Sequence, residues 1–131
     1  MLTYLSFGIL IQIFLLILPV KALIGRLRPT KIEYVYRICN MRDLEHGMAM
    51  PSGDTYACAF FCGLYYYIFN AHWIIYLCVP MVALGRVYVH CHWIGDTIVG
   101  GIVGIISSYY WFGSPYFSIM AKPFIMILFK K

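Results

Sequence analysis

The sequence predicts an all-α protein: an integral membrane bundle of about five hydrophobic helices. Of its 131 residues, 63% are apolar or aromatic and only 11% are charged, which is about half the charge of an average soluble domain. Residues 2–20, 55–84 and 97–121 contain no charged side chain. A run of about 20 such residues is long enough to cross roughly 30 Å of hydrocarbon as a helix. We therefore expect one multi-pass membrane domain over residues 1–131, in an organelle that the sequence does not indicate.

The first helix is expected over residues 2–27, stopped by Pro29. No basic leader or small-residue cleavage site precedes it, so we expect a retained span. The cations in its last turns suit the negative end of a helix dipole and lipid headgroups. Lys21 and Arg28 are seven residues apart, which is two helical turns and places them on one face. Two cations on one face can hold one anion.

The next segment, residues 30–50, has mixed charge and is expected to be an extramembrane loop. It is followed by Pro51-Ser52-Gly53-Asp54, a combination typical of a helix start. The free N–H groups of such a start, together with the positive end of the dipole, favour an anion. A simple N-cap by Ser52 or Asp54 is the alternative.

The apolar run over residues 55–84 is too long for one span. Its most polar break is Asn70-Ala71-His72, so we predict two short antiparallel helices over 55–69 and 73–85. His72 then lies in the turn between them, on the membrane face away from the other polar stretches.

The rest of the chain is expected to form a short connection over 86–91, a helix over 92–111 and a last apolar segment over 116–129. The helix over 92–111 contains four glycines, and small residues at such spacing allow close helix contact in lipid. The length of the last segment does not decide whether it spans the membrane or lies in the interface.

A cluster of titratable groups begins at Arg86. His92 and Asp96 are four residues apart, which on a helix places them on one face. A carboxylate behind a histidine orients the ring and raises its basicity, as a nucleophile or general base requires. The alternative is that Asp96 only satisfies a buried histidine. Counting the predicted crossings places this cluster on the same membrane face as Lys21 and Pro51.

Together these stretches predict a phosphoryl site. Lys21, Arg28 and Arg86 supply positive charge, and Ser52 and Gly53 supply hydrogen-bond donors, a set that suits a phosphate or a pentacovalent phosphorane. His92, oriented by Asp96, suits in-line attack on phosphorus with a phosphohistidine intermediate. Asp54 is a further acid, and the pattern calls for no metal and no cofactor.

The order and spacing of the motifs resemble the type-2 phosphatidate phosphatase superfamily of membrane phosphatases. The motifs are Lys-x6-Arg-Pro at residues 21–29, Pro-Ser-Gly at 51–53 and Arg-x5-His-x3-Asp at 86–96. The resemblance covers residues 1–111. It implies metal-independent hydrolysis of lipid phosphates or pyrophosphates. By this resemblance, His92 would be the nucleophile and Asp96 would orient it. The residues that would bind the phosphoryl group are Lys21, Arg28, Ser52, Gly53 and Arg86.

The chain departs from this family in three ways. The second motif ends in Asp54, where the family has a histidine that protonates the leaving oxygen. Gly85 replaces the usual serine before Arg86. Members usually have six spans, so this chain resembles the core without its first two. Losing one general acid typically costs about 10²–10⁴-fold in rate.

Three functional hypotheses follow. The first is an active lipid phosphatase, whose partners are lipid phosphates, phospholipid headgroups and membrane lipids. The second is a catalytically degenerate member that serves as a structural or lipid-binding subunit among other membrane subunits. The third, a haem or copper carrier, would use His46, His72, His90 and His92, but His72 falls on the opposite face. Nucleic acid is not expected despite the net charge of +5, because the basic residues lie beside hydrophobic spans and not in a surface stripe.

Overall fold

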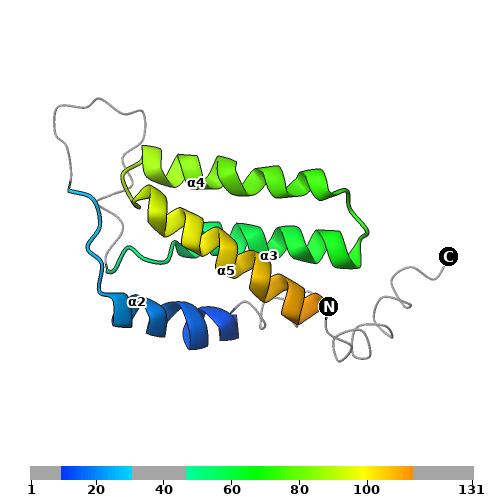
Figure 1. Ribbon diagram of the computed structural model, residues 1–131, viewed down its shortest axis with the longest axis horizontal. Coiled ribbons are helices and arrows are strands. Elements are labelled where there is room, and N and C mark those ends of the chain that lie inside the picture. Colours follow the sequence, from blue (N-terminus) through cyan, green and yellow to red (C-terminus); the bar gives the residue numbers. More distant parts are fainter. Residues whose placement is uncertain (1–9, 31–46, 114–131) are drawn as a thin grey trace.

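The computed structural model describes residues 10–30 and 47–113 (Figure 1). This part of the chain is helical and contains no strand, so the prediction of an all-α fold is confirmed for it. The expected helix over 116–129, most of the loop over 30–50, and His46 lie outside the described residues. The elements are, in order, η1 (Ile13–Ile17), α2 (Leu18–Ile24), α3 (Gly53–Ile68), η3 (Trp73–Leu77), α4 (Cys78–Tyr88) and α5 (Ile94–Phe112).

Helices α3 and α4 form an antiparallel pair, and α5 crosses α3 in front of it in Figure 1. A small apolar core of Phe60, Leu64 and Phe112 joins α3 to the end of α5. Among the described helices, none combines the length and hydropathy that a membrane crossing needs.

Glycines on α5 allow its backbone to contact the start of α3. A methyl group added at Gly100 would clash with the carbonyl oxygen of Ser52, and one added at Gly104 would clash with that of Tyr56. The close helix contact predicted from these glycines is therefore present. It lets the amide of Ser52 donate a hydrogen bond of 2.9 Å to the carbonyl oxygen of Asp96, which joins the second and third polar motifs.

The predicted end of the first helix at Leu27 was wrong. Helix α2 ends at Ile24, and Gly25 caps it with a left-handed φ of 61°, a conformation that glycine adopts without the steric cost of a side chain. Arg28 therefore lies beyond the helix, and the argument that it shares a helical face with Lys21 fails. The chain turns at Gly25 and carries Arg28 back toward the start of α5.

Other boundaries also differ from the prediction. Helix α3 begins at Gly53, and the expected helix over 73–85 is a 3-10 turn followed by α4, which continues past Arg86 to Tyr88. Helix α5 begins at Ile94 with Trp93 as its N-cap, so His92 precedes the helix. The contact between His92 and Asp96 thus does not arise from a shared helical face.

Candidate active site

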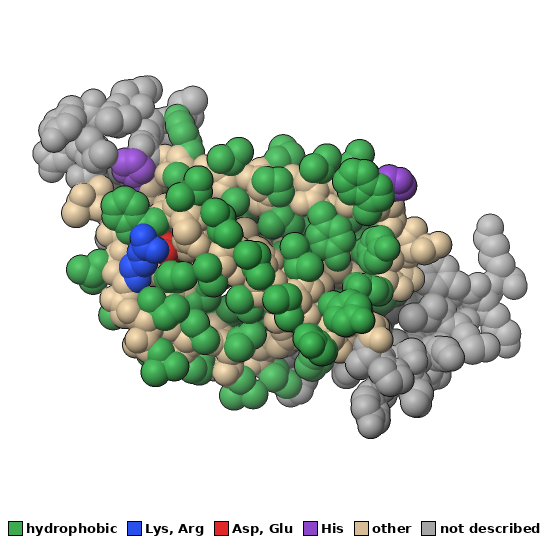
Figure 2. Space-filling model, viewed as in Figure 1, with side chains coloured by type: hydrophobic (Ala, Val, Ile, Leu, Met, Phe, Trp, Pro, Cys, Tyr) green, Lys and Arg blue, Asp and Glu red, His purple; other side chains and the backbone are tan. Residues whose placement is uncertain are grey.

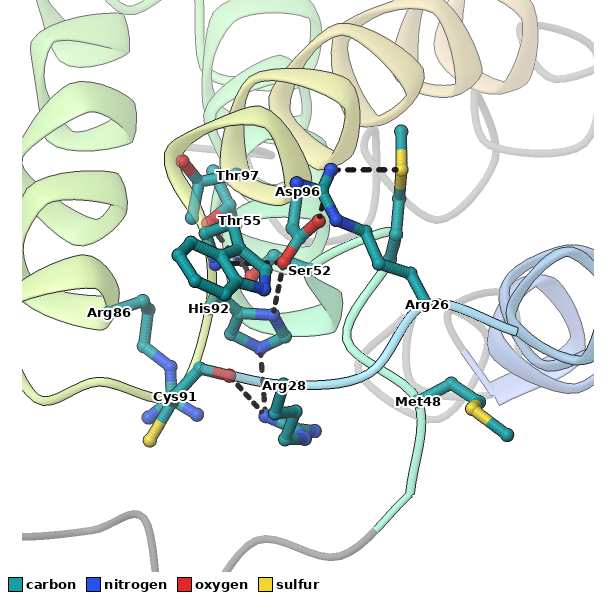
Figure 3. A network of polar contacts seen from close by, with 12 residues as sticks. Arg26, Arg28, Met48, Ser52, Thr55, Arg86, Cys91, His92, Asp96 and Thr97 are labelled. Carbon is teal, nitrogen blue, oxygen red and sulfur yellow. Dashed lines mark hydrogen bonds and ion pairs between the residues drawn. The ribbon is translucent and has the colours of Figure 1, made fainter. Parts of the chain in front are cut away.

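Three non-adjacent segments meet at one end of the bundle: residues 25–30 after α2, residues 47–52 before α3, and the connection from α4 to α5 (Figure 3). The amide of Ala49 donates a hydrogen bond of 2.8 Å to the carbonyl oxygen of Arg26. This bond, with the Ser52–Asp96 bond, holds the segments together through the backbone. The three predicted polar motifs are therefore brought to one place.

Asp96 is the most buried charged group of this end, with an exposed fraction of 0%. Its Oδ2 accepts a hydrogen bond of 2.8 Å from the amide of Trp93, as the acidic member of a capping box. The same oxygen lies 3.8 Å from Nδ1 of His92, which is longer than a hydrogen bond. Asp96 therefore lies behind the imidazole ring, in a contact that can tighten when the ring becomes positive.

His92 lies between Asp96 and Arg28 in Figure 3 and is 2% exposed. Its Nε2 is 3.3 Å from Nη1 of Arg28. Nη1 of Arg28 also donates a 2.8 Å hydrogen bond to the carbonyl oxygen of Cys91. Nε of Arg28 donates to the carbonyl oxygen of Gly47 at 3.2 Å. The ring thus has one nitrogen toward a carboxylate and the other toward a buried cation, where an anion would be held.

Positive charge surrounds the imidazole. Burial, and next the charges of Arg28, Lys21 and Arg86, lower the pKa of His92 to about 3. Lys21 is held close by because its Nζ donates a 3.3 Å hydrogen bond to the carbonyl oxygen of Met48. His92 is therefore neutral near pH 7, with a free electron pair on one ring nitrogen, and three expected phosphate-binding cations act on it.

At the start of α3, the side chain of Ser52 serves as the N-cap. It is fully buried, and its Oγ accepts hydrogen bonds from Thr55, from Oγ1 at 3.1 Å and from the amide at 3.5 Å. The structure therefore contains the simple N-cap by Ser52 that was the alternative to an anion site. Gly53 and Asp54 supply the first amides of the helix, which point toward its positive end, where anions bind.

Asp54 is more exposed, at 56% of its side chain, and forms an ion pair with Arg86. Its Oδ2 is 3.0 Å from Nε of the arginine. The pair joins the start of α3 to the last turn of α4 at the edge of the site. A carboxylate thus already contacts one of the cations expected to bind the phosphoryl group.

Sequence reasoning missed the role of Arg26. Its Nη1 lies 3.3 Å from Oδ1 of Asp96, and its guanidinium lies over the ring of Trp93, 5.9 Å from the centroid. A helix over residues 2–27 places Arg26 among the cations of its last turns, which suit the helix dipole and lipid headgroups. Gly25 was the available signal, because a glycine just after an apolar helical segment with a cation in its last turn is typical of a helix end.

His72 does not join this site. His72 caps η3 at the opposite end of α4, where its Nδ1 accepts a 3.3 Å hydrogen bond from the amide of Ile74. Within the described residues, no three His, Cys, Asp or Glu side chains are grouped as metal ligands. Two of the histidines of the haem or copper hypothesis, His72 and His92, are therefore separated, because they lie beyond opposite ends of the segment formed by η3 and α4.

Comparison with known proteins agrees with the motifs. The model of the family described as the PAP2 superfamily matches residues 1–119, which include every residue of the site. No curated protein and no solved structure matches the chain. The predicted resemblance to the type-2 phosphatidate phosphatases is thereby confirmed, and it implies phosphatase-type activity on phosphate esters. By this match, which covers most of its length, the chain belongs to the PAP2 superfamily.

Proposed function

We propose that the protein is a metal-independent membrane phosphatase that hydrolyses a lipid phosphate through a phosphohistidine intermediate. The observation that carries this proposal is the neutral, buried His92 held between Asp96 and Arg28. An imidazole in this position has an electron pair on Nε2 that can attack phosphorus. Its other nitrogen faces the carboxylate that stabilises the positive charge formed on attack.

The charge of the site supports a phosphate ester as substrate. With His92 neutral, four cations and two carboxylates leave a net charge of about +2, which complements the charge of −1.5 to −2 of a phosphate monoester near pH 7. Water screens the interactions of Arg28 and Asp96 least, because these two groups are buried. The groups counted, among the described residues, are Lys21, Arg26, Arg28, Arg86, Asp54 and Asp96.

The reaction takes two steps. In the first, the phosphoryl oxygens bind the cations and the first amides of α3, and Arg28 moves from Nε2 onto these oxygens. Nε2 then forms a bond to phosphorus while the bond to the lipid oxygen breaks, and Asp96 stabilises the imidazolium. In the second step, water attacks phosphorus, the N–P bond breaks and inorganic phosphate leaves.

Asp54 is the proposed proton donor to the leaving oxygen. It later accepts the proton of the attacking water, so that the cycle closes. Its ion pair with Arg86 holds the carboxylate against a cation, so this group is less available to the leaving oxygen than the histidine of other members. We expect turnover slower by about 10²–10⁴-fold than with that histidine, the usual contribution of one general acid.

The molecular surface supports a lipid environment. In Figure 2 hydrophobic side chains cover most of the visible face, and the charged side chains of the described residues gather at one end. Exposed apolar patches of this size are rare on soluble monomers. Exposed large hydrophobic residues on α4 and α5 include Met81, Leu84, Ile94, Ile98, Ile102 and Ile106.

Aromatic residues gather at the end away from His92. They lie at the last turns of α3 and α5 and in η3, and rings at such positions are typical of a membrane interface. We therefore propose that the bundle is embedded in a bilayer, with these rings at one interface and the phosphoryl site near the other. The exposed rings are those of Tyr65, Tyr66, Tyr67, Trp73, Tyr109 and Tyr110.

The second candidate function is a catalytically degenerate subunit of a larger membrane complex. It is favoured by one observation: Asp54 replaces the acid histidine and contacts Arg86. In that case the site would hold a phospholipid headgroup without turnover, and other membrane subunits would cover part of the apolar surface.

Phosphate release from a short-chain phosphatidate, measured in detergent with EDTA present, distinguishes the two functions. The first predicts release by the wild type and none by His92→Asn, and a covalent phosphoryl adduct that is lost with His92. His72→Asn, at the opposite end of α4, is the matched control and should release phosphate at the wild-type rate. Wild-type protein that releases none and purifies in a stoichiometric complex would overturn the first function in favour of the second.

A further inference from the structure

We infer that Arg26 is a positioning residue that acts on His92 through Asp96. The inference rests on the proposed function for its chemistry, but the contacts that carry it are independent of that function. Nη1 of Arg26 lies 3.3 Å from Oδ1 of Asp96, the carboxylate oxygen that faces away from the imidazole. Arg26 lies between the motif residues Lys21 and Arg28 but belongs to none of the three motifs.

The two oxygens of Asp96 are held differently. Oδ2 accepts the amide of Trp93 at 2.8 Å and faces Nδ1 of His92 at 3.8 Å, and Oδ1 faces Arg26. A carboxylate bound through one oxygen only can rotate about its Cβ–Cγ bond. Because the charge of Arg26 attracts the other oxygen as an ion pair, rotation of the carboxylate is disfavoured and Oδ2 stays directed at the ring.

The guanidinium is itself held in place. Its carbon lies 5.9 Å from the centroid of the Trp93 ring, and the indole of Trp93 donates a 3.0 Å hydrogen bond to the carbonyl oxygen of Leu27. The carbonyl oxygen of Arg26 accepts the amide of Ala49 at 2.8 Å. Nη1 of Arg26 also donates a 3.9 Å hydrogen bond to Sδ of Met50, so the guanidinium has contacts with Trp93, Asp96 and Met50.

The charge of Arg26 also affects the histidine. Arg28, Lys21 and Arg86 act on His92 directly, and Asp96 is the carboxylate beside it, while Asp54 contacts Arg86 at the edge of the site. Arg26 neutralises Asp96 from behind, which weakens the pull of the carboxylate on a proton of the ring. Removing this cation therefore lets His92 protonate at a higher pH. It also removes the contact that keeps the carboxylate of Asp96 oriented toward the ring.

Arg26→Gln tests the inference, with Leu27→Gln as the matched control. Leu27 is the neighbouring residue, and its side chain is 77% exposed. We expect Arg26→Gln to lower kcat by about 10–100-fold, the range found for groups that orient metal-bound histidines, with KM changed less than about threefold. Arg26→Lys keeps the charge without the fork of two donors and should recover part of the rate. Leu27→Gln should keep the wild-type kcat.

Titration of ¹⁵N-labelled histidines by NMR separates this inference from the proposed function, because it needs no turnover. His92 should begin to protonate at a higher pH in Arg26→Gln than in the wild type or in Leu27→Gln. That shift supports the inference even if the wild type hydrolyses nothing, in which case only the proposed function fails. An unchanged titration together with a wild-type kcat in Arg26→Gln would overturn it. If Arg26→Gln does not fold, Arg26→Lys takes its place, and a wild-type kcat together with a wild-type titration of His92 in that variant would overturn the inference as well.

Discussion

Asp54 and Arg86 form an ion pair across the edge of the site, with Oδ2 3.0 Å from Nε. In this superfamily the position of Asp54 is usually a histidine that protonates the leaving oxygen. Here an internal carboxylate contacts a cation that is proposed to bind the phosphoryl group. Under the proposed function the substitution has two consequences: the acid histidine is missing, and a competitor for Arg86 is present.

Asp54→His separates these consequences when it is compared with Asp54→Asn. The histidine restores an acid and removes the negative charge, so we expect kcat to rise by about 10²-fold or more, within the range that one general acid contributes. The asparagine removes the competitor together with the proposed proton donor, so KM should fall while kcat does not rise. Steady-state kinetics with a short-chain phosphatidate measures both. If Asp54→His leaves kcat unchanged, a defect elsewhere in the site limits the reaction.

Arg28→Lys should lose both stability and phosphate binding. The guanidinium is 8% exposed and donates to the carbonyl oxygens of Cys91 and Gly47, and a lysine cannot reproduce both bonds with one planar fork. We expect a loss of about 1–3 kcal/mol in the free energy of unfolding, the cost of leaving a buried acceptor without its donor. Thermal unfolding with and without inorganic phosphate tests this, because phosphate should raise the Tm of the wild type more than that of the variant.

The pH dependence of stability follows from His92. Its ordinary pKa of 6.5 applies to the unfolded chain, and in the folded protein the pKa is about 3. Below pH 6.5 the unfolded chain takes up a proton that the folded protein does not, so stability is lost as the pH falls from 6.5 toward 3. Each pH unit in that window lowers the free energy of unfolding by about 1.4 kcal/mol at most. Above pH 6.5 this contribution is fully present.

Thermal unfolding at pH 7.5 and pH 5 measures this effect. The decrease in Tm on acidification should be smaller in His92→Gln than in the wild type, because the glutamine does not titrate. His72→Gln, which replaces an exposed histidine, should lose as much Tm as the wild type. Equal decreases in all three proteins would show that His92 titrates alike in the folded and unfolded states.

Gly100→Ala tests the contact between α5 and α3. The added methyl group would clash with the carbonyl oxygen of Ser52. We therefore expect the free energy of unfolding to fall by about 1–3 kcal/mol, as for other overpacked contacts. The rate should fall too, because Ser52 and Asp96 would separate. Gly85→Ala in α4 is the control, since its methyl group meets nothing within 4 Å. The free energy of unfolding of this control should stay unchanged or rise by up to about 1 kcal/mol. Similar unfolding curves for the two variants would contradict this account of the helix contact.

Much of the site was predictable because its residues keep a fixed order and spacing along the chain. The structure brings Lys21, Arg28, Arg86, His92 and Asp96 together, as the three motifs indicated. The helix boundaries were less predictable. Gly25 ends α2 three residues before the predicted end at Leu27, because its left-handed backbone closes the helix. A hydrophobic run does not show such an end, since apolar residues continue on both sides of it.

The sequence by itself determined the helical fold, the family and the identity of the nucleophile candidate, because these depend on composition and on residue spacing. Only the tertiary structure decided which charges meet. Asp96 contacts Arg26, 70 residues away in sequence, and Asp54 contacts Arg86, 32 residues away. The first pair depends on how the chain turns at Gly25, and the second depends on how α4 packs against α3. Ion pairs between distant segments are set by such packing, and no local pattern in the sequence encodes them.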